Sequence, residues 1–173
     1  MLLIGAGGNP ASGLGGGSGG VTVWYGAAQN VPNSLKIQVG FTGNTATIVQ
    51  YLGTSGTPIT LLQANTPSSS VSVAAFTANY FSASGFFTSV AGQAGTSGSN
   101  TASATTFLSG GSGTTGNTTT ANYGYKTSGD GYFQLQPIIV GVGGTASGSG
   151  GIGCGAGSNG NAGGNGFALI ASW

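Results

Sequence analysis

The sequence predicts an all-β protein with a small sandwich-like core, packed extended glycine-rich segments and little or no α-helix. Short apolar stretches rich in β-branched and aromatic residues alternate with Gly, Asn and Pro, which is typical of strands and turns. No stretch of useful length has the 3.6-residue apolar period of a helix. In a chain of 173 residues, 38% are hydrophobic. That apolar content is too high for a solvated, disordered coil.

Seven stretches have the composition of β-strands. In "LKIQV", Leu35, Ile37 and Val39 alternate with Lys36 and Gln38, which is the pattern of a half-buried strand. Several short strands separated by turn residues favour a sandwich or barrel-like core. The seven stretches are residues 21–25, 35–39, 46–52, 58–63, 71–76, 131–140 and 167–173.

Glycine-rich stretches lie between these strands, at residues 5–20, 92–98, 110–117 and 141–166, and each has glycines spaced three apart. An extended helix of the polyproline II type has about three residues per turn, so glycine at every third position leaves one face without side chains. Neighbouring segments can then approach and hydrogen-bond through their backbones. Flexible loops are the alternative, but the recurrence in separate stretches favours packed polyglycine II segments.

The two ends of the chain are both apolar and both adjoin glycine. Leu2, Leu3 and Ile4 precede the first glycine stretch, and residues 167–173 follow the last one. We therefore expect a single domain, residues 1–173, in which terminal strands near 1–4 and 167–173 pair in one sheet. The two-residue period of a strand would place Phe167, Leu169 and Trp173 on one face.

Charged and catalytic residues are almost absent. Only Lys36, Lys126 and Asp130 carry charge, and there is no His. General acid–base catalysis, paired-carboxylate hydrolysis and transition-metal binding all lack their usual groups. No glycine stretch ends in the Gly-Lys-Ser/Thr of a phosphate-binding loop. The sequence predicts a non-enzymatic protein without cofactor, metal or nucleic-acid partner, since a net charge of +1 attracts no polyanion.

Targeting signals are also missing from the pattern. The N-terminal apolar run has no basic flank, and the later runs are far shorter than the roughly 18 residues of a membrane span. We expect synthesis in the host cytoplasm and no membrane insertion. Cys154 has no cationic neighbour in sequence and is expected to be a small buried thiol.

Both ends of the chain resemble a known family. The stretches "LLIGAGGNPASGLGGGSGG", "VTVWY", "NVPNSLKIQVGFTGN" and "GGIGCGAGSNGNAGGNGFALIASW" are similar, in order, to the glycine-rich domain of bacteriophage tail-fibre and virion proteins. That family has a P-x-x-L-x-I-x-V-G-x-x-G element and ends on a hydrophobic-x-I-x-x-W strand. Residues 53–132 depart from it, because Thr, Ser and Ala replace the glycine runs.

The resemblance implies a virion protein, which would be a capsid, decoration or tail component. Such a protein would assemble with copies of itself, for which we expect a trimer, or with other virion proteins. The alternatives are a tail-fibre adhesin that binds a host-surface glycan or outer-membrane protein, and a secreted ice- or surface-binding protein. Binding loops in such proteins often carry aromatics, which stack on sugars or pack a partner. Core packing is the other interpretation of the candidates, which are Tyr80, Phe81, Phe86, Phe87, Tyr123, Tyr125 and Tyr132.

Overall fold

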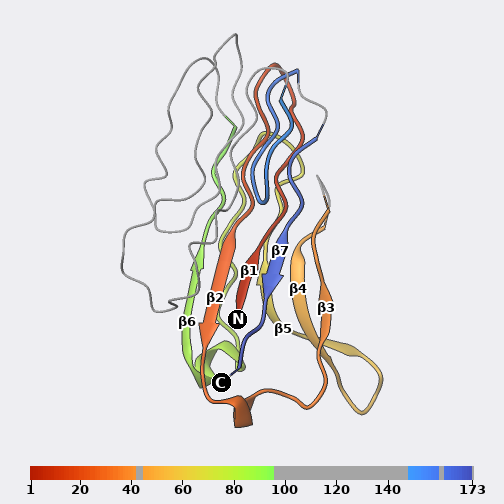
Figure 1. Ribbon diagram of the computed structural model, residues 1–173, viewed down its shortest axis with the longest axis vertical. Helices are drawn as coiled ribbons and strands as arrows, with labels where there is room; N and C mark the ends of the chain where they lie inside the picture. The colour runs from red at the N-terminus through yellow and green to blue at the C-terminus, as the bar shows by residue number, and fades with distance from the viewer. Residues whose placement is uncertain (42–44, 96–147, 160–161, 173) are drawn as a thin grey trace.

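The computed structural model describes residues 1–41, 45–95, 148–159 and 162–172. Two antiparallel sheets pack face to face, and extended glycine-rich segments continue from one end of them (Figure 1). The first sheet has the order β6-β2-β1-β7 and the second β3-β4-β5. The described residues contain no α-helix, so the expected all-β class is confirmed. The strands are β1 Leu2–Ile4, β2 Val21–Tyr25, β3 Lys36–Gln38, β4 Thr47–Leu52, β5 Pro58–Ala64, β6 Phe86–Val90 and β7 Phe167–Leu169, with short 3-10 turns η1 Ala28–Asn30 and η2 Ser82–Ser84.

Two strand expectations differ from the structure. Residues 71–76 form no strand, because side chains take up their backbone groups: Asn65 Nδ2 donates to the Ala74 carbonyl, and the Phe76 amide donates to Ser89 Oγ. Strand β6 is not among the strands expected from the sequence, where only its first two residues, Phe86 and Phe87, are named, as candidates for a binding loop. The expected strand at 131–140 lies outside the described residues.

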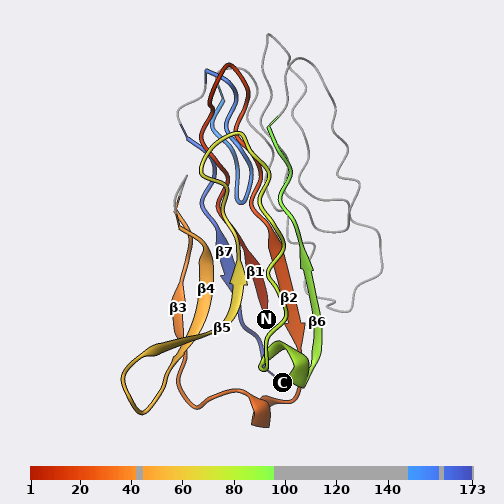
Figure 2. The ribbon, with the colours of Figure 1, turned by 180° about the vertical axis from the view of Figure 1, so that it is seen from behind.

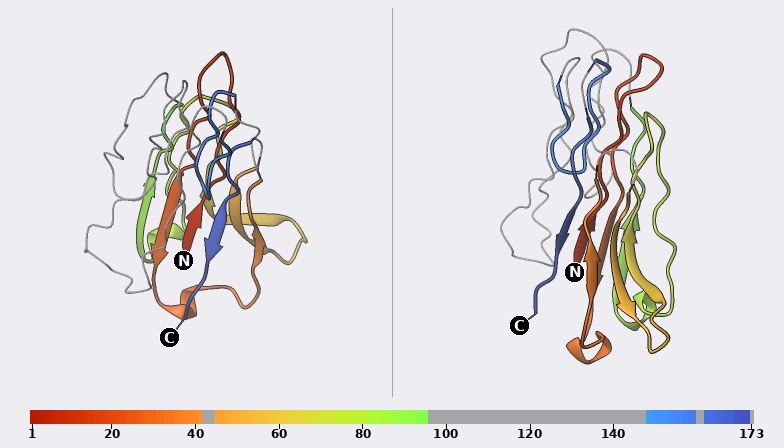
Figure 3. Two further views of the ribbon diagram at one scale, coloured as in Figure 1. Left: turned by 45° about the horizontal axis from the view of Figure 1, so that its top comes forward. Right: turned by 90° about the vertical axis from the view of Figure 1, so that its right-hand side faces the viewer.

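The main core lies between the two sheets, which are seen edge-on in Figure 3 and from behind in Figure 2. Trp24 of β2 stacks on Phe81, which precedes η2, with ring centroids 4.8 Å apart. Leu3, Val49 and Leu62 are fully buried in the same cluster. The core therefore joins the second sheet to the middle strands of the first.

The opposite face of the first sheet is apolar as well. Side chains alternate along β1, so that Leu3 faces the core while Ile4 joins Val21 and Val23 in a second cluster, with Leu2 and Phe167 packed against it. A strand with two apolar faces has a sequence that is one continuous hydrophobic run. This explains the uninterrupted "LLI" of β1.

The two terminal strands lie side by side. β1 pairs with β7 in antiparallel register, Leu2 opposite Leu169 and Ile4 opposite Phe167, which is the pairing that the sequence leads us to expect. β7 is shorter than expected, since Ile170 lies beyond its end and is partly exposed. Trp173 lies outside the described residues.

Buried hydroxyl groups bridge the sheets where they meet the glycine segments. Thr47 Oγ1, fully buried on β4, donates to the Ile4 carbonyl of β1 at 2.6 Å and accepts from the Gly40 amide at 3.0 Å. Thr22 Oγ1 on β2 donates to the Gln63 carbonyl of β5 at 2.6 Å. Each hydroxyl thus links a strand of one sheet to the backbone of the other.

Replacing Thr47 with Val should therefore destabilise the protein without changing its shape. The substitution keeps the side-chain volume but leaves a buried carbonyl and a buried amide unpaired, which costs about 2 kcal/mol. The matched control is Thr60→Val, because the Thr60 hydroxyl has no hydrogen bond within the described part of the chain. Chemical unfolding would measure both variants, and equal losses of unfolding free energy would contradict this role of Thr47.

Candidate functional site

The glycine-rich segments form a hydrogen-bonded bundle around residues 16–20. Each amide of this central segment donates to a backbone carbonyl, and the acceptor changes in turn among three neighbours, residues 153–156, 65–69 and Gln93. The direction repeats after three residues, as expected of packed polyglycine II segments. The donor–acceptor distances are 2.7 Å from Gly16 to Ala156, 2.9 Å from Gly19 to Gly153, 2.9 Å from Gly17 to Ser69, 2.9 Å from Gly20 to Asn65 and 2.8 Å from Ser18 to Gln93.

A fourth neighbour donates to the same central segment. The amides of Gly5 and Gly8, three residues apart, each donate at 2.8 Å to the carbonyls of Gly20 and Gly17. Residues 5–8 thus run antiparallel to the central segment. The two segments are joined at their tip by a tight turn in which Ser12 and Gly13 both have positive φ, as in the two-residue turns of hairpins.

The bundle requires glycine because its backbones touch. A Cβ added at Gly7 would lie 1.8 Å from the carbonyl oxygen of Cys154, and one at Gly16 would lie 1.9 Å from that of Gly8. Both distances are far inside van der Waals contact, and the atoms they meet are backbone. The expected packing of the first and last glycine stretches is thereby observed within the described residues, while the stretch at 110–117 lies outside them.

Gly16→Ala should accordingly disrupt the bundle, whereas Gly53→Ala should not. The Cβ at position 16 meets a backbone carbonyl that cannot move without breaking its neighbours' hydrogen bonds, while at position 53 the nearest atom is 3.4 Å away and belongs to a side chain. We expect a loss of about 3 kcal/mol or more for Gly16→Ala. Thermal unfolding followed by circular dichroism measures it. Equal midpoints for the two variants would mean that the bundle tolerates the extra atom.

The structure separates the aromatic candidates. Tyr80 is 97% exposed, and Phe86 is about half exposed at the start of β6. Phe81 is 8% exposed and stacks on Trp24, so it lies in the core, which is the other interpretation of the candidates. Phe87 packs against the core and meets Phe76 edge-on, with centroids 6.2 Å apart, and is a core residue too.

The remaining candidates, Tyr123, Tyr125 and Tyr132, lie outside the described residues. Sequence reasoning missed Tyr25, a half-exposed residue that lies opposite Phe86 across β2 and β6. Alternation in "VTVWY" gives the signal, because a buried Trp24 places its neighbour on the other face.

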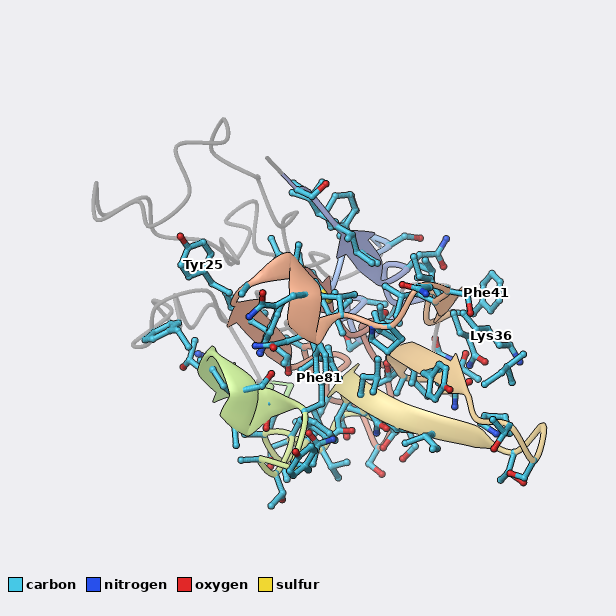
Figure 4. All side chains as sticks on the ribbon, turned by 90° about the horizontal axis from the view of Figure 1, so that it is seen from below. Tyr25, Lys36, Phe41 and Phe81 are labelled. Atoms are coloured by element: carbon cyan, nitrogen blue, oxygen red, sulfur yellow. The ribbon has the colours of Figure 1, made fainter. Side chains whose placement is uncertain are left out.

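The exposed aromatics gather at the sandwich end of the molecule. Tyr80 lies two residues before η2, which lies at the opposite end from the tips of the glycine segments in Figure 1. Seen from that end, Tyr25 points outward, while Phe81 lies between the sheets (Figure 4). The tip of the bundle at residues 9–13 carries Asn, Pro, Ala, Ser and Gly and no aromatic residue.

A second exposed apolar surface, the β3 edge, lies along strand β3 and the residues after it. Ile37, Val39 and Phe41 occupy alternate positions there, and Ile37 and Phe41 are 47% and 66% exposed. Lys36 precedes Ile37 in the same strand, so its side chain lies on the opposite face of the sheet. Lys36 is the one charged side chain within the described ranges.

The described residues contain no group of three or more His, Cys, Asp or Glu that could bind a metal ion. Cys154 is fully buried in the bundle, with its Sγ 3.4 Å from the Ile152 carbonyl oxygen. Within the same ranges, no helix has both the length and the apolarity to cross a membrane.

The comparisons with known proteins give no relative for this fold or site. No family model matches the chain, and no curated protein or solved structure is significantly similar to it.

The amino terminus is a titratable group with a perturbed environment. In the chain that begins at Met1, the terminal amine donates to the Trp24 carbonyl at 2.7 Å, and its burial lowers its pKa below the ordinary value of 8.0. The folded state thus disfavours the charged amine. Between the lowered pKa and 8.0 the unfolded chain binds more protons, so stability rises with pH across that window.

We therefore expect the Tm to rise with pH across the window between the lowered pKa of the amine and 8.0, since the chain has no histidine that could titrate there instead. Calorimetry at a series of pH values measures this. Protein acetylated at its amino terminus is the control and should show no rise. A rise of the same size in the acetylated protein would assign the titration to another group.

Proposed function

We propose that the protein is a non-enzymatic structural protein of a bacteriophage virion, a capsid or tail component that packs against copies of itself or neighbouring virion proteins. The observation that carries the proposal is the character of the exposed surface. Large apolar side chains, including Ile37, Phe41 and Tyr80, are exposed, while only 2% of the chain is charged. Charge is what ordinarily keeps small proteins apart in solution, and exposed apolar groups favour association.

The fold supports a scaffolding role. Backbone hydrogen bonds hold the glycine segments in contact with one another, and the sandwich anchors them at one end. A bundle of this kind needs no charged groups for its cohesion. The virion setting comes from the resemblance of both chain ends to the glycine-rich domain of phage proteins, and the composition, with a single carboxylate side chain and no histidine, supports a role without acid–base chemistry.

Sedimentation velocity over a range of protein concentrations tests the assembly. We expect an oligomer whose population changes little with salt, because apolar contacts are not screened as ion pairs are. A monodisperse monomer at high concentration would contradict the proposal. Antibody labelling of purified phage particles by electron microscopy then tests the virion setting, and particles without label after infection would exclude it.

A tail-fibre adhesin is the second candidate, favoured by the exposed aromatics at the sandwich end. Tyr80 presents nearly its whole ring to solvent, and exposed tyrosines stack on sugar rings. Glycan recognition through this residue would leave the fold unaffected, since the ring contributes little to the core.

For the adhesin, Tyr80→Ala should lower binding to host cells by about tenfold while leaving the Tm unchanged. Val71→Ala is the matched control, because Val71 is an exposed apolar residue without a ring. Flow cytometry with labelled protein measures the binding. Undiminished binding by the Tyr80 variant would remove this residue from any receptor site.

A further inference from the structure

Strand β3 has a sheet neighbour on one side only. It is an edge strand of the second sheet, paired with β4, and Ile37 lies opposite Val49 there, which in turn lies opposite Leu62 of β5. These three residues share the face that turns toward the first sheet. Val49 and Leu62 are fully buried, but Ile37 is 47% exposed. The core-facing side of the second sheet thus extends beyond the first sheet at β3.

Backbone and side chains of the β3 edge are both suited to pairing with another strand. An edge strand offers unpaired amide and carbonyl groups that template further sheet. Leu35, which packs against the core, continues the alternation of Ile37, Val39 and Phe41. Within the described ranges, the edge therefore combines a strand that is paired on one side only with a row of apolar residues on one face, although the Phe41 amide already donates to Thr45 Oγ1.

We propose that β3 pairs in antiparallel register with β3 of a second copy, about a two-fold axis that passes at Gln38, so that two three-stranded sheets become one continuous sheet. The proposal rests on the proposed function, since it names the surface through which copies pack. It commits to a second copy because this strand is complementary to itself.

The register follows from the sequence of the strand. A centre at Gln38 sets Ile37 opposite Val39 of the second copy and Leu35 opposite Phe41, so that every apolar residue of the row meets another. Lys36 then lies opposite Gly40, and the two lysines are well separated. A centre at Lys36 would oppose two like charges, which destabilises a cross-strand pair.

Such a contact closes with two copies. The same surface patch serves both subunits, so the interface is isologous and cannot propagate into a ring, as a trimer requires. The trimer expected from the sequence would need a different, head-to-tail contact. The number of copies in the oligomer thus shows which surface is used: a dimer is expected from the β3 edge, and a trimer from a different contact.

Disulfide trapping tests the register directly. In the proposed pairing, residues 38 of the two copies are directly opposite, and opposed residues of antiparallel strands have Cα atoms about 4.5–5.5 Å apart, within disulfide reach. Gln38→Cys should form a covalent dimer under mild oxidation. Lys36→Cys is the matched control: its two copies would be offset by four residues, about 13 Å along the strand, and should not cross-link. The native Cys154 is fully buried.

Cross-linking of the Lys36 variant but not the Gln38 variant would overturn the register, and cross-linking of neither would overturn the pairing. Association is measured independently by sedimentation with Ile37→Lys, which should raise the dimer dissociation constant by about tenfold or more. Leu52→Lys is the control, because Leu52 lies in the same sheet and is 50% exposed. If the wild-type protein assembles but Ile37→Lys assembles equally well, the β3 edge is excluded while the structural role stands. If the wild-type protein is monomeric, both fail.

Discussion

The close approach of bare backbones is the constraint on which the rest of the structure depends. Within the bundle, carbonyl oxygens lie where the Cβ atom of any other residue would be, so the glycine positions are fixed by contact rather than by flexibility. The central segment uses every amide from Gly16 to Gly20 to bind a neighbour. Because the backbone groups hydrogen-bond to one another, side chains are not needed to hold the bundle together, which is consistent with their small size there.

The same constraint accounts for how the sandwich joins the bundle. At the junction, the Thr47 hydroxyl donates to the Ile4 carbonyl and accepts from the Gly40 amide, so one side chain binds backbone groups of two segments. Serine and threonine suit this position because they are small and both donate and accept. An abundance of these residues therefore reflects how the two parts of the fold are connected, besides how the protein is hydrated.

Local pattern predicted those parts of the fold that depend on a single stretch of chain. The apolar and β-branched composition of residues 21–25 and 46–52 predicted β2 and β4, and the spacing of three predicted the packed glycine segments. The structure placed Phe81 in the core because Trp24, distant in sequence, supplies its stacking partner, and no local pattern contains that contact. For the same reason residues 71–76, although rich in β-branched residues, form no strand: the groups that capture their backbone come from Asn65 and Ser89. The exposure of Tyr80 and of the β3 edge likewise depends on where the first sheet ends.

The pairing of β1 with β7 also bears on how the chain acquires its structure. β1 lies between β2 and β7, and its partner residues Leu2 and Leu169 come from nearly opposite ends of the chain. Closing so large a loop is entropically costly, and folds dominated by such distant contacts form slowly. During synthesis the N-terminal strand leaves the ribosome long before its C-terminal neighbour has been made. One side of β1 is therefore unpaired in the nascent chain. The chain carries few charges that would repel other nascent chains on the same messenger RNA. The topology thus leaves one side of β1 open to association with other chains until the C-terminal strand has been made.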